Sequence, residues 1–103
     1  MPTEIGLLEH LEILTLSNNK IEGTLPSEAG QLSQLTKLEV NLNSLTGEIP
    51  ATLGNLVKLK ILWLHDNLFT GEVPGAVCDL RKVELDRLWA DSEVCDDCCD
   101  ASF

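Results

Sequence analysis

The amino-acid sequence predicts an α/β repeat protein, a right-handed solenoid with parallel strands on its concave face and short 3₁₀ or helical turns on its convex face. The first observation is a 24-residue pattern, LxxLxLxxNxLTGxIPxxLGxLxx, that occurs in phase three times, beginning at Leu11, Leu35 and Leu59. The second is that each copy opens with alternating apolar residues, the period of a short strand, and continues with Asn, Gly and Pro at constant offsets, which are turn residues. Such units bury their apolar faces only by stacking on one another.

The pattern divides one continuous domain into five segments. These are a partial repeat (1–10), three full repeats (11–34, 35–58 and 59–82) and a cysteine-containing C-terminal cap (83–103). The stretch from Met1 to Leu8 fits the IPxxLGxL part of the pattern, with Met1 in the Ile position. We therefore expect a start in mid-repeat, with a frayed N-terminus or further repeats upstream in a larger parent protein.

Each repeat is expected to form a strand, a turn and a short helical segment. The Asn after each strand has an amide that both donates and accepts, which suits it to satisfy backbone groups of its own turn and of the neighbouring coil. The Gly permits a tight bend, and the Pro fixes φ where no ladder donor is needed. The inward strand residues are Leu14, Leu16, Leu38, Val40, Leu62 and Leu64; the asparagines are Asn19, Asn43 and Asn67; and the residues carried inward after each Pro are Ala29, Leu53 and Val77.

The C-terminal segment departs from the 24-residue spacing. Strict spacing would place Asp86 at an inward position, which suits a carboxylate poorly. A register moved by two residues instead puts Leu85 first and Leu88 fourth, followed by the sequence Trp-Ala-Asp.

The three copies with their LTGxIP segment resemble the plant-type leucine-rich repeat, and the match covers nearly the whole chain. The second register is similar to the cap of secreted plant and algal leucine-rich repeat proteins, which runs LxxLxADC and ends in a cysteine cluster close to a terminal CF. Ser92 and Ser102 stand where that cap has cysteines, so its disulfide pairing does not carry over. The resemblance implies the group of receptor-kinase ectodomains and polygalacturonase-inhibiting proteins, which bind extracellular peptides, co-receptors or cell-wall enzymes.

Composition narrows the classes of partner. The formal net charge of -10, with 17 acidic against 7 basic residues, opposes nucleic acid and anionic membrane surfaces, because binding to phosphate requires clustered Lys and Arg. No apolar run approaches the ~20 residues that a membrane-spanning helix needs, so we expect no membrane insertion by this chain. The N-terminal sequence MPTEIGLLEH shows no signal peptide, whereas the cysteine cluster favours an extracellular or secretory-pathway location.

The four cysteines, Cys78, Cys95, Cys98 and Cys99, are interpreted as disulfides that staple the cap. Adjacent cysteines seldom bond to each other, which leaves Cys78 to Cys98 with Cys95 to Cys99, or Cys78 to Cys99 with Cys95 to Cys98. A metal or redox cluster is the alternative. It is disfavoured because the two Asp residues between Cys95 and Cys98 raise the pKa of nearby thiols and no His lies close in sequence.

Two acidic sets are interpreted as solvated surface. The first is the C-terminal run, which lacks the ordered alternation and central Gly of a calcium loop. The second flanks the LTG turns and is explained by solubility. Their members are Asp91, Glu93, Asp96, Asp97 and Asp100 in the first set, and Thr24, Glu48 and Glu72 with Glu22, Thr46 and Thr70 in the second.

Function is expected at the outward strand positions, because packing fixes the inward ones. In strand order these are Ile13, Thr15, Ser17 and Asn18; Lys37, Glu39, Asn41 and Leu42; and Ile61, Trp63, His65 and Asp66. Parallel strands lie about 4.8 Å apart, so Thr15, Glu39 and Trp63 should form one column, which Trp89 extends if the cap strand stays in step. A second column should contain Ser17, Asn41 and His65. Trp side chains often anchor interfaces, and the candidate binding residues are Glu39, Asn41, Trp63, His65, Asp66 and Trp89.

A catalytic triad of Ser17, His65 and Asp66 is not favoured. Adjacent strand residues point to opposite sides, Ser17 lies about 9 to 10 Å from His65 across two strand spacings, and an open face does not exclude water. We expect no enzyme and no cofactor. The favoured function is non-enzymatic recognition of a protein or peptide by the strand face. The alternatives are a truncated fragment whose parent carries the binding site, and a small metal or redox module.

Overall fold

The structure is a computed structural model that describes residues 1–95 and 98–102. Asp96 and Asp97 of the acidic run therefore lie outside the described residues. The elements are η1 (Thr3–Leu7), β1 (Ile13–Thr15), β2 (Glu22–Thr24), η2 (Ser27–Gln31), β3 (Lys37–Glu39), β4 (Ser44–Glu48), η3 (Ala51–Asn55), β5 (Ile61–Trp63), β6 (Leu68–Thr70), α1 (Gly75–Cys78), η4 (Asp79–Lys82), β7 (Arg87–Ala90) and β8 (Ala101–Ser102), where η is a 3₁₀ helix.

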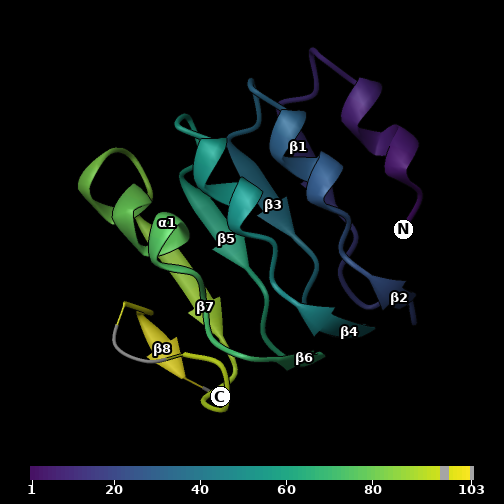
Figure 1. Ribbon diagram of the computed structural model, residues 1–103, viewed down its shortest axis with the longest axis vertical. Coiled ribbons are helices and arrows are strands. Elements are labelled where there is room, and N and C mark those ends of the chain that lie inside the picture. The colour runs from purple at the N-terminus through teal and green to yellow at the C-terminus, as the bar shows by residue number, and fades with distance from the viewer. Residues whose placement is uncertain (96–97, 103) are drawn as a thin grey trace.

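One strand from each repeat joins the main sheet. The strand order is β1-β3-β5-β7-β8, and the neighbouring strands are parallel. Figure 1 shows these strands side by side, with the short helical segments stacked in a second row along one side of the sheet. The predicted solenoid of parallel strands and short helical turns is confirmed.

The cap strand follows the register that is moved by two residues. Leu62 lies opposite Leu88 in the pairing of β5 with β7, whereas Leu38 lies opposite Leu62 one repeat earlier. This register buries Leu85 and Leu88, with 3% and 0% of their surface exposed, and leaves Asp86 in solvent. The apolar residues thus decide the register, because the strict spacing would have buried a carboxylate.

A second sheet, which the sequence analysis does not predict, lies beside the LTG turns. Its order is β2-β4-β6, again parallel, and it runs along the opposite edge of the molecule from the helical row (Figure 1). Thr24 lies opposite Thr46 and Glu48 opposite Thr70, so equivalent residues of successive repeats are offset in this sheet.

The core is a stack of aliphatic layers between the main sheet and the helical row. The strand residues Leu38, Val40, Leu62 and Leu64 and the post-proline residues Ala29, Leu53 and Val77 are all fully buried, as predicted. Leu14 and Leu16 of the first repeat are only half-buried, because the partial repeat covers them incompletely. In the described part of the chain, no helix has the length and apolar character needed to cross a membrane.

The predicted role of the turn asparagines is also observed. The Asn43 side-chain amide donates to the carbonyl oxygens of Leu16 and Val40, each at 2.9 Å. Its Oδ1 accepts from the backbone N–H groups of Asn19 and Ile21, each at 3.0 Å. One side chain therefore closes its own turn and also ties it to the preceding repeat.

Candidate functional site

A column of outward residues crosses four strands of the main sheet. Thr15 lies opposite Glu39, Glu39 opposite Trp63, and Trp63 opposite Trp89. The sequence predicts this column as far as Trp63. Because β7 stays in step with β5, Trp89 extends it into the cap.

Trp63, His65 and Trp89 form an aromatic cluster at the C-terminal half of this face. The two indole rings stack with their centroids 5.0 Å apart and their planes 8° from parallel. The His65 ring lies edge-on to both, with centroid distances of 5.4 Å to Trp89 and 6.1 Å to Trp63. Neighbouring parallel strands lie about 4.8 Å apart, so two flat side chains at paired positions can stack. Trp63 and Trp89 are paired because the cap strand is offset by 26 residues from β5, instead of the 24 residues that separate earlier strands.

The aromatic cluster combines exposed apolar area with one covered polar atom. Trp63 and Trp89 are half-buried, so part of each ring remains accessible on the concave face. The indole N–H of Trp63 is covered and has no hydrogen-bond acceptor among the residues that the structure describes. A buried donor of this kind ordinarily has a partner, so its burial without one costs free energy.

Three of the predicted binding residues are more deeply covered than the sequence analysis expects. Glu39, Asn41 and His65 expose only 7%, 6% and 7% of their surface. A period of two predicts which side of a strand a residue faces, but its coverage depends on the bulk of the side chains on neighbouring strands. His65 is covered by both indoles, whereas Asp66 remains exposed.

Polar side chains on the concave face make contacts with one another. Ser17 Oγ donates to Asn41 Oδ1 at 2.6 Å, and Lys37 Nζ lies 3.8 Å from Glu39 Oε2. In the second column the Ser17 hydroxyl is thus bonded to Asn41, on the strand between Ser17 and His65.

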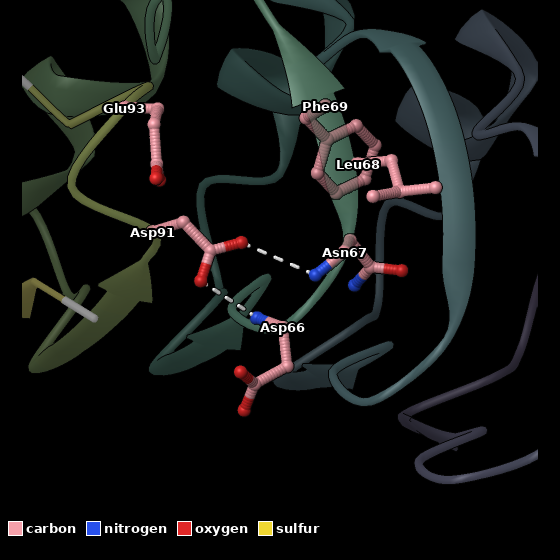
Figure 2. A pocket seen from close by; sticks show the side chains of 6 residues that line it. All are labelled: Asp66, Asn67, Leu68, Phe69, Asp91 and Glu93. Carbon is pink, nitrogen blue, oxygen red and sulfur yellow. Dashed lines mark hydrogen bonds between the residues drawn. The ribbon is translucent and has the colours of Figure 1, made fainter.

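A pocket of about 490 Å³ lies where β5 and β6 approach the cap. It is lined by Asp66, Asn67, Leu68, Phe69, Asp91 and Glu93. Figure 2 shows Asp91 and Glu93 on the cap segment and Leu68 and Phe69 on the other side. Asp91 accepts two backbone hydrogen bonds, from Asp66 N–H at 2.8 Å and from Asn67 N–H at 3.1 Å.

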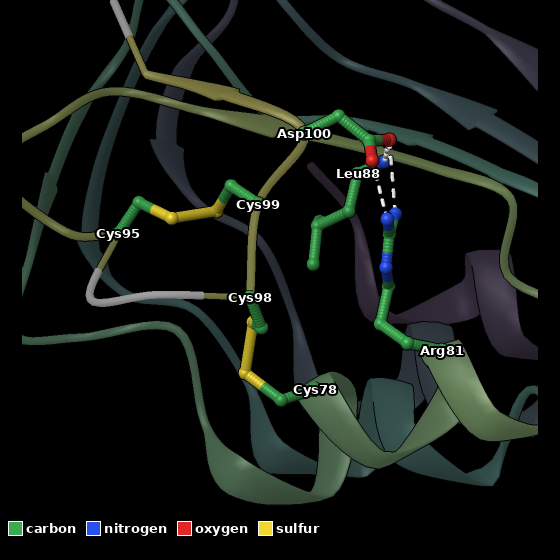
Figure 3. The surroundings of a disulfide bond; sticks show 7 residues. All are labelled: Cys78, Arg81, Leu88, Cys95, Cys98, Cys99 and Asp100. Carbon is green, nitrogen blue, oxygen red and sulfur yellow. Dashed lines mark hydrogen bonds and ion pairs between the residues drawn. A yellow bond between two sulfur atoms is a disulfide. The ribbon is translucent and has the colours of Figure 1, made fainter.

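The cap is held by two disulfides, Cys78–Cys98 and Cys95–Cys99. This is the first of the two pairings that the sequence leaves open. The first bridge ties the cap to α1, and the second closes a short loop within the cap (Figure 3). None of the four thiols is left free, so they are not available as metal ligands. No group of three or more His, Cys, Asp or Glu in the described ranges could hold a metal ion.

Arg81 and Asp100 form a clasp between η4 and the end of the cap. The guanidinium donates to both carboxylate oxygens, with Nη1 to Oδ2 at 2.9 Å, and Oδ2 also accepts from Leu88 N–H at 2.8 Å (Figure 3). The hydrogen bonds from Arg81 lower the pKa of the Asp100 carboxyl, and Asp100 in turn raises the pKa of Arg81.

The interpretation of the C-terminal acidic run as a merely solvated tail is therefore wrong for Asp91 and Asp100. The Asp91 carboxylate accepts backbone hydrogen bonds from Asp66 and Asn67 of the third repeat. The Asp100 carboxylate accepts a backbone hydrogen bond from Leu88 within the cap and side-chain hydrogen bonds from Arg81 of the third repeat. Single-sequence reasoning missed them because their donors are distant in sequence and belong to no repeated position. The sequence Ala90-Asp91, which matches the AD of the cap pattern LxxLxADC, was the one available signal for Asp91.

Comparison with known proteins supports this architecture. A family model described as a leucine-rich repeat region matches residues 1–101. No curated protein matches the chain.

Solved structures that are similar to the chain include receptor ectodomains and an ice-binding protein. The plant peptide hormone receptor RGFR1 in complex with RGF2 is 36% identical with a TM-score of 0.80, and the match covers 93% of this chain and 15% of that chain. The BIR3–SERK2 complex from Arabidopsis thaliana is 32% identical with a TM-score of 0.80, covering 88% and 50%. A plant ice-binding protein is 33% identical with a TM-score of 0.73, covering 93% and 30%. The chain thus spans at most half the length of these structures.

Proposed function

The chain belongs to the leucine-rich repeat family, and on that premise we propose that it is a non-enzymatic recognition module that binds a protein or peptide through its concave strand face. Similar structures include a peptide hormone receptor bound to its peptide and a complex of two proteins. They also include an ice-binding protein, so the fold alone does not decide the function. The residues of the concave face carry the functional information.

The half-exposed Trp63–Trp89 stack is the observation that carries the proposal. Its parallel rings, 5.0 Å apart, present rigid apolar area at low cost in side-chain entropy. Glu39 lies opposite Trp63 on the neighbouring strand, and His65 lies edge-on to both rings. Asn41 belongs to the second column, and Asp66 adds an exposed carboxylate.

An extracellular setting completes the proposal. Two disulfides close the cap, and disulfides persist in oxidising compartments such as the secretory pathway and the cell exterior. The partner is therefore an extracellular protein or peptide.

Site-specific photocrosslinking tests the proposal. A photoreactive phenylalanine analogue is placed at position 37, on the concave face beside the column, and at position 57, where Val57 is 54% exposed outside the strand face. Each protein is mixed with an extracellular protein and peptide extract and irradiated. We expect a discrete crosslinked species only from position 37, and its loss when Trp63→Ala and Trp89→Ala are combined.

Two crosslinking results would contradict the proposal. A crosslink from position 37 that survives the double Trp variant, or one that forms only from position 57, places binding outside the aromatic cluster. Far-ultraviolet circular dichroism of the double variant verifies that the solenoid remains folded.

A second candidate function is that of a terminal part of a longer receptor or inhibitor whose further repeats share in binding. It is favoured by the N-terminal end of the solenoid, where Leu7 and Leu8 are 73% and 50% exposed. Leu11 and Leu14 are half-buried, while Leu35 and Leu38, one repeat later, are fully buried. This apolar end fits another repeat.

Completion of the N-terminal partial repeat tests that candidate. A copy of residues 35–48 placed before Met1 continues the pattern in phase, and we expect it to raise the urea midpoint and to protect the amides of residues 13–15 from hydrogen exchange. Unchanged protection at β1 would show that this end of the solenoid does not accept a repeat.

A further inference from the structure

The two sheets end at different points along the solenoid. The main sheet continues beyond β5 through β7 and β8, whereas the second sheet stops at β6. Among the described residues, no strand pairs with β6 on the side that faces the cap. An edge strand of this kind presents alternate N–H and C=O groups that can pair with another chain.

Two hydrogen bonds mark the ends of this open edge. At one end Asn67 N–H donates to Asp91 Oδ2 at 3.1 Å, and at the other Val73 N–H donates to the Val94 carbonyl at 2.7 Å. Between these points the three residues of β6 (Leu68–Thr70) form the strand, about 10 Å long at about 3.3 Å per residue, and Gly71, with a φ of 76°, ends it. An added strand of about three residues fits that length.

The pocket of about 490 Å³ lies along the same edge, within the range of about 300 to 1,000 Å³ that is usual for ligand pockets. Leu68 is 62% exposed and contributes apolar surface beside the largely buried Phe69. Asp91 and Glu93 face them from the cap (Figure 2). A ligand in this position would therefore meet apolar surface on one side and carboxylates on the other.

The negative charge of this surface favours extended ligands that carry positive charge. Asp66, Asp91 and Glu93 contribute three carboxylates, and none of the six lining residues is basic. Both oxygens of Asp91 accept backbone hydrogen bonds, so Asp91 chiefly shapes the rim, while the exposed Asp66 and Glu93 face solvent. With a formal net charge of -10, the whole chain reinforces the attraction of a cation.

We propose that the free edge of β6 binds an extended, Lys- or Arg-containing peptide segment of a partner, which adds as a strand to the second sheet. Backbone hydrogen bonds to the edge supply affinity, as in other cases of strand addition. Alternate side chains of the segment contact Leu68 or reach the carboxylates of Asp66 and Glu93. Asp66 borders both this surface and the concave face, but Leu68, Phe69 and Glu93 lie apart from the aromatic cluster of Trp63, His65 and Trp89. The proposal therefore rests on the β6 edge and on Glu93, and does not depend on the proposed function of the concave face.

The test uses a fluorescein-labelled hexapeptide of alternating lysine and valine as the probe. Binding is followed by fluorescence anisotropy at low and at physiological salt, and the site is mapped by amide chemical shifts of the ¹⁵N-labelled protein. Two control peptides accompany it: one with glutamate in place of lysine, and one with the lysines retained but alternate backbone amides methylated. The second removes backbone donors without changing the charge.

Two variants with the same change in charge complete the design. Glu93→Lys reverses a carboxylate in the pocket, and Glu9→Lys reverses an exposed carboxylate in the loop after η1. We expect the lysine peptide to shift the amides of residues 68–71, and Glu93→Lys to weaken binding at least fivefold while Glu9→Lys leaves it within twofold. The methylated peptide should bind at least tenfold more weakly, and the glutamate peptide should not bind.

Several outcomes would overturn the proposal. Equal weakening by Glu9→Lys and Glu93→Lys, or undiminished binding of the methylated peptide, would reduce the interaction to general charge attraction. Shifts confined to Trp63 and His65 would assign the peptide to the concave face instead. Concentration-dependent protection of the β6 amides without peptide would identify a second copy of the chain as the occupant.

Discussion

The indole rings of Trp63 and Trp89 stack in parallel across two neighbouring strands, with their centroids 5.0 Å apart. They belong to different structural units, since Trp63 lies in β5 of the third repeat and Trp89 in β7 of the cap. The stack therefore couples the candidate binding face to the cap that closes the solenoid. Substitutions that destabilise the cap should therefore also change the position of Trp63 on the concave face.

A double-mutant cycle should detect this coupling. We expect Trp63→Ala and Trp89→Ala to show an interaction free energy of about 1 kcal/mol, the usual value for an aromatic pair beyond its buried area. Urea unfolding of the wild type, both single variants and the double variant measures it. Trp63→Ala paired with Val57→Ala, outside the strand face, is the matched control and should be additive; a near-zero Trp63–Trp89 term would contradict an energetic role for the stack.

Asn43 should matter far more to stability than Asn19, although both occupy the same position of the repeat. The Asn43 amide ties two repeats through bonds to Leu16, Val40, Asn19 and Ile21, whereas Asn19 Nδ2 contacts only its own turn, at Ser17 O. We expect Asn43→Ala to cost about 3 kcal/mol, because it leaves several backbone groups unpaired.

Chemical denaturation of the two variants decides this comparison. Asn19→Ala, at an exposed turn, should cost less than about 1 kcal/mol. Equal losses from the two substitutions would show that the asparagines act only within their own turns.

Gly54 should be intolerant of a side chain because neighbouring helical turns approach each other closely there. A Cβ at this position would lie 2.7 Å from Ala76 Cβ and 2.8 Å from the Ala76 carbonyl oxygen. The turns η3 and α1 would have to separate, and we expect Gly54→Ala to cost about 2 kcal/mol. Gly75→Ala is the control, because a Cβ there meets nothing within 4 Å. Thermal unfolding of both variants tests the prediction, which fails if their midpoints agree.

The two disulfides should contribute unequally to stability. Cys78–Cys98 closes a separation of 20 residues and Cys95–Cys99 one of 4. Loop entropy predicts about 3 kcal/mol for the longer loop and about 2 kcal/mol for the shorter one. Paired Ser substitutions of each bridge, compared by urea unfolding, measure the difference. Intact mass after alkylation without reductant provides the prior check, since four modified thiols would mean that neither bridge forms.

Much of the fold was predictable because the information is repeated. Leucines at a period of two indicate which side of each strand faces the core, and Asn, Gly and Pro mark the turns. Both patterns occur three times in phase. The second sheet was not predictable from the same pattern. Its strands include segments such as Glu22–Thr24, which has no alternating apolar residues and forms a strand only because the neighbouring turns align it.

The sequence predicted where the residues of the candidate site lie on the sheet, but it did not predict how far each side chain is exposed. The register of Trp63 and Trp89 follows from the cap spacing, since Leu85 and Leu88 must be buried. The burial of Glu39 and His65 depends on side chains from neighbouring strands, which a single-strand pattern does not describe. Asp100 was missed for a related reason, because its donors lie on other elements.

Asp100 should make the cap sensitive to acid. Its hydrogen bonds from Arg81 hold the pKa of the carboxyl below its ordinary value in the folded protein, although partial burial opposes the shift. A carboxyl with a lowered folded pKa contributes its full stabilisation above the unfolded pKa, which is about 4 for Asp, and loses it as the pH falls through the folded value. The raised pKa of Arg81 contributes below its own unfolded pKa, so it is constant across this acidic range.

Comparison of Asp100→Asn with the wild type isolates this contribution. Asn retains an acceptor for Leu88 N–H but loses the charge, and we expect a cost of about 1 kcal/mol at pH 7 for this partly exposed pair. The difference in unfolding free energy between the two proteins should shrink as the pH is lowered below about 4, whereas other carboxylates affect both proteins alike. A difference that stays constant from pH 7 to pH 2 would show that the charge of Asp100 does not stabilise the cap.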